Sequence, residues 1–582
     1  MSRKESRGIS RRRFLQGTAA AGLGTAATAA GVTPAAADPL VPQPPHGAEL
    51  RGMDLATQSP TTEGRFGFMF KNQPPHPASG TVLEDLGLNF MEEQPVISTV
   101  PPVATKDDND RFNENPNPLL TSGFTFVGQF VDHDITFDTT TLDQQQSDPY
   151  ATTNFRVPRY DLDSLYGLGP SKHPQLYDPA DRDKFLIVKR PYSDIRGVKL
   201  KTPGVVYDVP RDTAGKATIA DPRNDQTLIV LQIHVALQMF HNKLVDYMRA
   251  IRVPRAAVFE TARRLARWHY QWMVTHDFLP AIVGKDMMDS VYKEVLTGVP
   301  IINIKYYKPM NPLGRPFIPV EFSVAAYRFG HSIARPRYTV QDFINSAGTP
   351  VAVSSVPLFS DTEPFDNRLN GSRELPARMK LQWSKFFNKA GVPTARPVRQ
   401  FDANLSDALF KLPSTALPDS NPTSRLSVRN LLRGRKMGLP SGQQVARLMG
   451  VTPLTNEQLW RTRSIEVKIP IATEGQFKNV VEILREFDVE NQSLKQVLDD
   501  PGWNGEAPLW FYILKEAEIV GEGRVMGPVG GRIVAEVLVG LLQHDKNSYL
   551  YLQPTWKPAP PIAPARGQFT MADLVSYAQG WS

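Results

Sequence analysis

Residues 225–251 carry the strongest helical signal in this chain of 582 residues. Apolar side chains recur there mostly at steps of three and four residues, the spacing that lines one face of a helix. These positions are Leu228, Leu231, Ile233, Ala236, Leu237, Phe240, Leu244 and Tyr247. A second helix is expected over 255–279, opening after Pro254 and closing before Pro280. Two long neighbouring helices predict a fold that is mainly α.

Shorter helices are expected along the rest of the chain, which has no internal repeat. They fall at 82–88, 321–334, 427–432, 441–449, 506–519 and 531–542. Only short segments such as 185–189 resemble strands. The 51 prolines favour long ordered loops over a regular bundle. The expected fold is therefore mainly helical, with long loops and little β structure.

Composition divides the chain into parts. Residues 38–120 are rich in Pro, Asn and Gly and predict a wrapping N-terminal arm. Helical periodicity begins near Ser122, so one large domain is expected over 121–552, followed by a C-terminal arm over 553–582 with a Pro-rich start. Apolar residues make up 41% and charged residues 21%, as in ordinary globular proteins, and the length suffices for a large core.

Residues 1–37 predict an export signal. Ser10-Arg11-Arg12-Arg13-Phe14-Leu15 resembles a twin-arginine signal, and a weakly apolar Ala/Gly/Thr segment follows it. Ala35-Ala36-Ala37 then offers small residues for cleavage. A disordered basic start is the alternative. No later segment reaches the roughly 18 uninterrupted apolar residues of a membrane span, so a periplasmic or extracellular protein is expected.

The absence of cysteine excludes disulfides, zinc–thiolate sites and any cofactor held through cysteine sulfur. The net charge of +7 is mild for this length, and the sequence has no basic block or aromatic–basic stripe. We therefore expect no nucleic-acid partner. The motifs, rather than the composition, must indicate the chemistry.

A dense group of polar side chains lies at 129–134, within Gly128-Gln-Phe-Val-Asp-His-Asp134. On a helix, Gln129 and His133 share one face because they are four residues apart. Asp132 and Asp134 point about 100° to either side of His133. One helical turn therefore aims an imidazole and an amide in one direction and two carboxylates elsewhere. A solvated Asp-rich turn would also fit this stretch alone.

Four later segments complement this motif. They are 161–167 (DLDSLYG), 221–226 (DPRNDQ) with 241–244 (HNKL), 327–331 (YRFGH), and 430–435 (NLLRGR) with 438–440 (GLP). In this order the five motifs resemble those of the animal-type haem peroxidases, in their bacterial branch. The resemblance covers roughly residues 80–550. It implies a haem peroxidase domain that reduces hydrogen peroxide and oxidises a halide, thiocyanate or a small aromatic donor.

The resemblance implies haem b with His331 as the axial iron ligand. It also implies that Asn430 accepts the proton of the other ring nitrogen and that Arg433 pairs with a haem propionate. Both roles agree with general chemistry, since ligating histidines usually donate their second N–H and a guanidinium suits a carboxylate. Taken alone, His331 also fits a buried core histidine, and the other two fit an exposed polar face.

On the opposite side of the haem, the resemblance makes His133 the base that takes a proton from hydrogen peroxide. Arg223 would stabilise the negative charge that develops as the O–O bond breaks. Gln129 would hold distal water or an anionic donor. By itself, Arg223 also fits a surface arginine at the start of a helix.

Asp132 stands where the family forms an ester with a haem methyl group. A second ester normally comes from a Glu, and this chain has Gln226 there, which cannot form it. Thr227 replaces the Met that forms a sulfonium link in some members. The resemblance therefore implies at most one covalent link to haem, through Asp132, and this puts chloride oxidation in doubt.

Calcium is the second cofactor that the resemblance implies. Asp134, Asp161 and Asp163 would supply carboxylates, and Val157 and Arg159 would supply backbone carbonyls, the hard oxygen ligands that calcium prefers. This chain has Val157 where the family usually has Thr, and Asp163 where Ser is usual. An ordinary polar turn is the alternative for 161–163.

Two rival functions stay open. Fatty-acid dioxygenases share this fold and carry a radical tyrosine three residues before the axial histidine, where this chain has Arg328. Tyr327 is one residue earlier, so only a local bulge would turn it inward. The second rival is a non-catalytic haem-binding or adhesion protein, against which the joint presence of His133, Arg223 and His331 argues.

Overall fold

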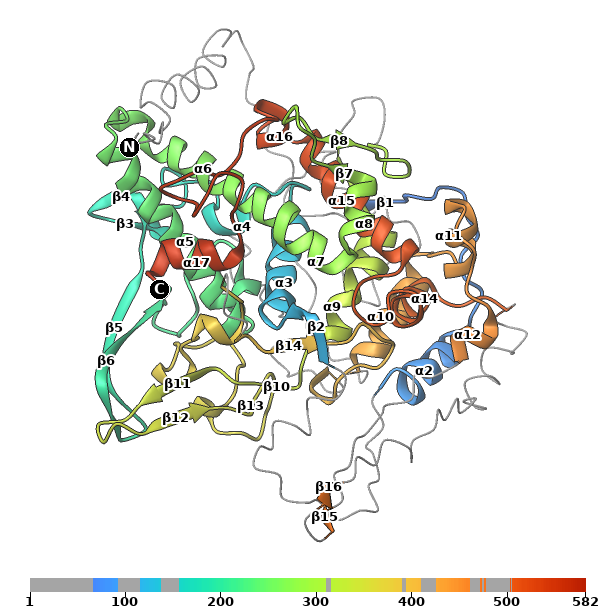
Figure 1. The fold of residues 1–582 in the computed structure, drawn as a ribbon, viewed down its shortest axis with the longest axis horizontal. Helices are drawn as coiled ribbons and strands as arrows, with labels where there is room; N and C mark the ends of the chain where they lie inside the picture. The colour runs from blue at the N-terminus through green and yellow to red at the C-terminus, as the bar shows by residue number, and fades with distance from the viewer. Residues whose placement is uncertain are drawn as a thin grey trace.

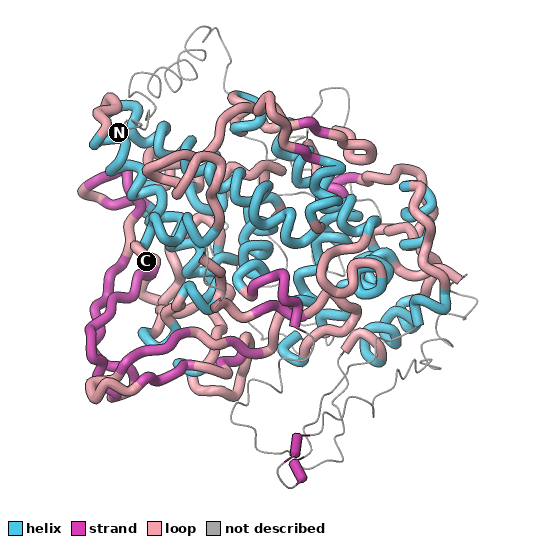
Figure 2. Tube along the Cα trace, in the orientation of Figure 1, coloured by secondary structure: helices cyan, strands magenta, loops and turns pink. Residues whose placement is uncertain are grey.

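The computed structural model describes residues 66–92, 116–137, 156–309, 316–389, 394–409, 425–460, 503 and 505–581, together with 472–473 and 476–477. The signal expected over 1–37, and much of the arm expected over 38–120, lie outside these residues. Within them the chain is mainly helical, and most of its strands are short (Figures 1 and 2). The predicted fold class is confirmed.

Helix α5 (Leu228–Ala250) is largely buried and confirms the helix predicted over 225–251. The side chain of Thr227 caps its start by accepting a hydrogen bond from the Val230 amide at 3.3 Å. Helices α6 (Val258–Met273) and α17 (Met571–Gln579) pack against it. By length and hydropathy α5 alone among the described helices could cross a membrane, but 83% of its apolar window is buried inside the protein, as in a core helix.

The helix predicted over 255–279 does not end before Pro280. A π turn, η6 (Val274–Phe278), follows α6 and leads directly into α7 (Leu279–Val283), which contains the proline. A π turn changes the hydrogen-bond pattern, so the missing N–H of proline is tolerated within a continuous helical path. The chain turns only at Gly284, whose φ of +82° a glycine adopts without strain.

The other predicted helices are present, with ends shifted by a few residues. They are α2 (Gly80–Asn89), α10 (Leu426–Lys436), α11 (Gly442–Met449), α14 (Leu509–Ile519) and α15 (Pro528–His544). Helix α2, part of the expected arm, packs on α10. The arm therefore contributes to the core on the side of the molecule where α10 lies (Figure 1).

The described strands form two-stranded pairings, and the longest is the hairpin of β5 (Val188–Ile195) and β6 (Val198–Asp208). This hairpin was not predicted from the sequence. The strand predicted over 185–189 instead spans the end of β4 (Asp181–Phe185) and the start of β5. Most hairpin side chains are exposed or half-buried, so apolar alternation is weak, and its turn is Arg196-Gly197 rather than the usual Asn-Gly.

Two short elements face the centre of the molecule from different parts of the chain. Helix α3 (Gly123–Ile135) contacts both α5 and the four-residue helix α9 (Gly330–Ile333). Before α9 the chain forms a π turn, η7 (Glu321–Ala325), and a 3-10 turn, η8 (Ala326–Phe329). The segment predicted as one helix over 321–334 is therefore helical but changes its winding twice.

Candidate active site

A cavity of about 360 Å³ lies between residues of α3 and residues of the η7–α9 segment. Its walls are largely apolar and aromatic, and this volume falls within the range of small-molecule sites. Its polar lining includes Gln129, Asp132, His133, Arg223, Gln226, Arg328, His331 and Arg433. Six residues predicted from the sequence, Gln129, Asp132, His133, Arg223, His331 and Arg433, thus meet at one cavity.

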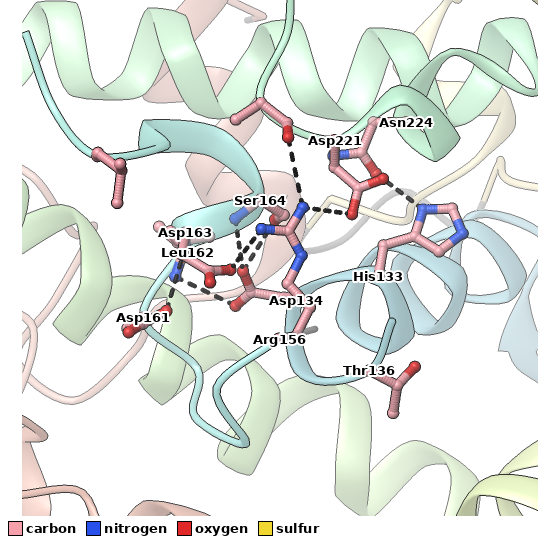
Figure 3. Close-up of polar contacts among 12 residues, drawn as sticks. His133, Asp134, Thr136, Arg156, Asp161, Leu162, Asp163, Ser164, Asp221 and Asn224 are labelled. Carbon is pink, nitrogen blue, oxygen red and sulfur yellow. Dashed lines mark hydrogen bonds and ion pairs between the residues drawn. The ribbon is translucent and has the colours of Figure 1, made fainter. Parts of the chain in front are cut away.

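His133 lies on the last turn of α3 and is buried. Its Nδ1 donates a hydrogen bond to Oδ1 of Asn224 at 2.8 Å (Figure 3). The amide of Asn224 is oriented by its Nδ2, which donates to Nδ1 of His234 at 3.1 Å. The proton of His133 is therefore held on Nδ1, and the lone pair of Nε2 is left for the cavity.

Burial, and then the nearby positive charge of Arg223, lower the pKa of His133 to about 4. The imidazole is consequently neutral at pH 7. A neutral imidazole with a free Nε2 is the form that acts as a base.

Arg223 lies in the 3-10 turn η4 (Pro222–Asp225) and reaches the end of α3. Its Nη2 donates to the carbonyls of His133 (2.8 Å) and Thr136 (2.7 Å). Its Nε and Nη2 donate to the two carboxylate oxygens of Asp221 at 3.1 and 2.7 Å. These bonds fix the guanidinium beside His133, with one edge lining the cavity.

Asp221 is fully buried and caps η4 by accepting the amide of Arg223. Although burial alone would raise its pKa, the guanidiniums of Arg223 and Arg156 hold that pKa well below its ordinary value. Asp221 is therefore a charged anchor for the cavity arginine. The sequence analysis assigned it no role.

Asp132 lines the cavity one residue before His133, and its Oδ1 accepts a hydrogen bond from the Thr136 hydroxyl at 3.0 Å. Gln226 also lines the cavity, so the position where the family carries a second ester-forming acid holds an amide here. Gln129 lines the cavity one helical turn before His133, as its spacing predicts.

His331 and Asn430 are paired, as predicted, with 2.8 Å between Nδ1 and Nδ2. The direction differs from the prediction. The guanidinium of Arg328, which can only donate, bonds to Oδ1 of Asn430 at 2.6 Å, and the amide therefore presents its Nδ2 to His331. Burial, and then the charge of Arg328, lower the pKa of His331 to about 3.

Gly330 precedes His331 at the wall of the cavity. A Cβ placed on Gly330 would meet no atom within 4 Å, so open space lies directly over this backbone. Tyr327 also lines the cavity, and its hydroxyl donates to the Gly128 carbonyl of α3 at 3.2 Å. Helical spacing alone would turn Tyr327 away from the position of the radical tyrosine. The segment before α9 instead contains a π turn and a 3-10 turn, and Tyr327 lines the cavity.

Asp134, Asp161 and Asp163 come together as a carboxylate cluster, with one oxygen of each within 4.8 Å of the others. Asp134 is fully buried and accepts hydrogen bonds from the Leu162 amide (3.2 Å) and the Ser164 hydroxyl (2.8 Å) (Figure 3). Burial, and then the charges of Asp163 and Asp161, raise the pKa of Asp134 well above its ordinary value. Such mutual repulsion is what a bound cation relieves.

The other two residues predicted for this site, Val157 and Arg159, lie in the loop that leads into Asp161. The carbonyl of Val157 accepts the amide of Arg159 at 2.7 Å. Sequence reasoning missed Asn224, although it directly follows Arg223. It also missed Arg156, whose buried guanidinium lies between Asp163 and Asp221 (Figure 3).

Comparisons with known proteins find relatives named as peroxidases. A peroxidase-like protein of Margaritifera margaritifera is 28% identical over 229 residues, 38% of this chain and 26% of its own. The chorion peroxidase of Drosophila melanogaster is 25% identical over 350 residues, 59% of this chain and 36% of its own. The matches thus span only a quarter to about a third of these relatives.

Among solved structures, a fatty acid α-dioxygenase of Arabidopsis thaliana aligns with a TM-score of 0.51 at 14% identity, over 89% of this chain and 78% of its own. That likeness supports the fold alone. The profile of the family described as animal haem peroxidase matches residues 161–468, which is 308 of the 582 residues. The chain belongs to the animal haem peroxidase family.

Proposed function

We propose that the protein is a haem peroxidase that reduces hydrogen peroxide and oxidises a halide, thiocyanate or a small aromatic donor. The observation that carries the proposal is that His133 and His331 line the same cavity, with Arg223 bonded beside the first and Asn430 behind the second. Membership of the family supports the same activity.

The residues around the cavity fit a haem. His331 would hold the iron through Nε2, because its Nδ1 is engaged by Asn430. Ligation in this form places a proton on Nδ1. Oδ1 of Asn430 would accept that proton only after the amide turned and gave up its hydrogen bond from Arg328, whose guanidinium would then need another acceptor. The apolar walls and the open space over Gly330 suit a flat macrocycle, and Arg433 in the lining suits a propionate.

When bound, haem supplies the redox-active iron at which peroxide is reduced. The protein side chains move the proton. Nε2 of His133 accepts a proton from hydrogen peroxide and returns it to the departing oxygen, which leaves as water. Arg223 donates hydrogen bonds to the oxygen that gains negative charge as the O–O bond breaks. Two electrons from the donor and two protons convert one peroxide into two waters, and Gln129 would orient water or an anionic donor.

Covalent attachment of haem would involve at most Asp132. Its carboxylate is at the cavity wall, and the amide of Gln226 cannot form the second ester. We propose that calcium binds the carboxylate cluster, with carbonyls of Val157 and Arg159 as further ligands. The cation would join α3 to the loop before α4 (Asp163–Tyr166). Export through the twin-arginine signal of residues 1–37 belongs to the same proposal.

A fatty-acid dioxygenase is the second candidate, because Tyr327 reaches the cavity. Its hydroxyl already donates to the Gly128 carbonyl, and Arg328 occupies the position of the radical tyrosine in the resembled enzymes. Oxygen uptake with linoleate and no added peroxide would favour this candidate. If the unaltered protein takes up no oxygen with linoleate but oxidises a donor when peroxide is added, the peroxidase is favoured.

The decisive experiment compares absorption spectra of the haem-reconstituted protein with those of two variants. H331A should lose the Soret band, whereas H133A should keep it and react with peroxide roughly 10²–10⁴-fold more slowly, the typical contribution of one general base. A Soret band unchanged in H331A would refute the axial ligand. A near-native rate in H133A would remove that histidine from the mechanism and favour a non-catalytic haem protein.

A further inference from the structure

We propose that Arg156 is a positioning residue that links the carboxylate cluster to Arg223 through Asp221. The inference rests on the proposed function only in that Arg223 and His133 would face the reacting peroxide. The link itself consists of contacts between charged groups, all of them buried except the half-buried Arg223. It adds a second connection between two sites that His133 and Asp134, neighbours on α3, already join.

The first contact joins Arg156 to the carboxylate cluster. The Arg156 side chain is 0% exposed, and its Nη1 lies 3.3 Å from Oδ1 of Asp163. A guanidinium in this environment stays charged and cannot turn to solvent.

The second contact joins Arg156 to the anchor of the cavity arginine. Nη2 of Arg156 donates to Oδ2 of Asp221 at 2.6 Å, and Nη2 of Arg223 donates to the same oxygen at 2.7 Å. Because one buried oxygen serves both guanidiniums, a change in the position of Arg156 changes the field and the space available to Arg223.

The third contact returns to α3. Arg223 donates to the carbonyl of His133, and the next residue along the helix is Asp134 of the carboxylate cluster. The contacts therefore form a closed ring from the cluster through Arg156, Asp221 and Arg223 back to the end of α3. Figure 3 shows one part of this ring, with Arg156 between Asp163 and Asp221.

The carboxylates of the ring and the cluster outnumber the guanidiniums that compensate them. The cluster and Asp221 together contribute four carboxylates, and the two arginines contribute two guanidiniums. Two negative charges remain when all groups are ionised, which a divalent cation would balance. Removing the charge of Arg156 would leave Asp163 and Asp221 as buried charges with less compensation.

The test uses Asp163 and Asp161 as a matched pair. Both are cluster carboxylates, and Asp→Asn conserves shape, but Asp163 contacts Arg156, whereas Asp161 accepts the Asp163 amide at 3.2 Å. D163N, D161N, R156M and the double variant R156M/D163N would be compared in chelator, which removes any cation. R267M is the arginine control, because Arg267 donates to the Asp161 carbonyl at 2.6 Å from the α6 side of the loop.

Two measurements report on the distal side of the cavity. Hydrogen exchange of amides 133–137 needs no haem, and the cyanide dissociation constant of the haem-loaded protein reports on anion binding beside Arg223. We expect D163N and R156M to speed exchange and to weaken cyanide binding by about fivefold or more, the low end of coupling between linked sites. R267M should change either quantity less than about twofold, D161N should change both less than D163N does, and the double variant should match R156M.

Equal effects of D161N and D163N, or additive effects in the double variant, would overturn the proposal. If R156M fails to fold, the comparison of D163N with D161N decides alone. If the protein takes up no haem, the proposed function fails through the missing Soret band, while hydrogen exchange still decides the role of Arg156.

Discussion

The amide of Asn224 determines which nitrogen of His133 can act as a base, and N224D tests this directly. Asp has the same shape and still accepts the Nδ1 proton of His133 at the 2.8 Å contact, but it adds a negative charge. An opposite charge at this distance typically raises a histidine pKa by about 1–3 units. The pKa of His133, about 4 in the unaltered protein, should therefore rise to between about 5 and 7.

Asn224 also contacts His234, and this contact can be kept in N224D while His234 stays neutral. His234 now accepts a hydrogen bond at Nδ1, and its Nε2 has no hydrogen-bond partner among the described residues. Moving the His234 proton from Nε2 to Nδ1 lets the neutral ring donate to the new carboxylate. The added negative charge is therefore free to stabilise protonated His133.

The assay is the rate of the absorbance change after mixing the haem-loaded protein with peroxide, measured from pH 3.5 to 8. Only the unprotonated base reacts, so the rate falls below the pKa of His133. The acid limb should lie near pH 4 in the unaltered protein and about 1–3 units higher in N224D. A pKa of about 6 would slow the reaction about tenfold at pH 5, since each unit is a tenfold change.

The matched control is N117D, which adds an acid at another fully buried asparagine. Asn117 donates to the Arg524 carbonyl at 2.8 Å and accepts the Leu119 amide, and it does not line the cavity. N117D should leave the acid limb where it is in the unaltered protein. An acid limb that is unmoved in N224D, or that moves equally in both variants, would refute the assignment of His133 and its tautomer.

Three further outcomes are expected. D132N should release all its haem into acidified acetone, and a digest of the unaltered protein should contain no haem on the peptide of Gln226; haem found there would contradict the single-link proposal. Calcium at about 100 times its Kd should raise the free energy of unfolding by about 2.7 kcal/mol, and D134N should abolish this response, whereas an equal response in D134N would move the ion elsewhere. His269 is fully buried, and burial lowers its pKa from 6.5 to about 4, so it binds fewer protons folded than unfolded and its contribution to stability is lost as pH falls below about 6.5. That loss approaches about 3.5 kcal/mol below pH 4, from 2.5 units at about 1.4 kcal/mol each, and H269Q should remove the corresponding pH dependence in chemical unfolding; an unchanged pH dependence would count against a buried neutral ring.

The elements that could be predicted from the sequence are those whose signal is local. Helix α5 was predictable because its apolar side chains repeat over many turns. His133 and His331 were identified because each lies in a compact motif, and the structure brings both to one cavity. The hairpin of β5 and β6 was missed because little of it is buried, so its side chains alternate only weakly.

Contacts between distant residues were not predictable in the same way. Asn224 and His133 are 91 positions apart, and Arg156 and Asp221 are 65 apart. Polar pairs of this kind create no periodicity, and one sequence gives no sign that two residues depend on each other. The reversed direction of the bond between Asn430 and His331 depends on a third residue, Arg328, whose contact also becomes visible only in three dimensions.

The packing of α17 on α5 has a consequence for how the chain is made. Residues 571–579 pack on α5, which ends at Ala250. The ribosome must therefore add 329 residues after Ala250 before this helical partner of α5 is complete. At typical ribosomal rates this takes roughly 15–65 s. Throughout that interval a long apolar helix lacks one of its partners, and a chaperone that shields nascent chains would have its natural binding segment there.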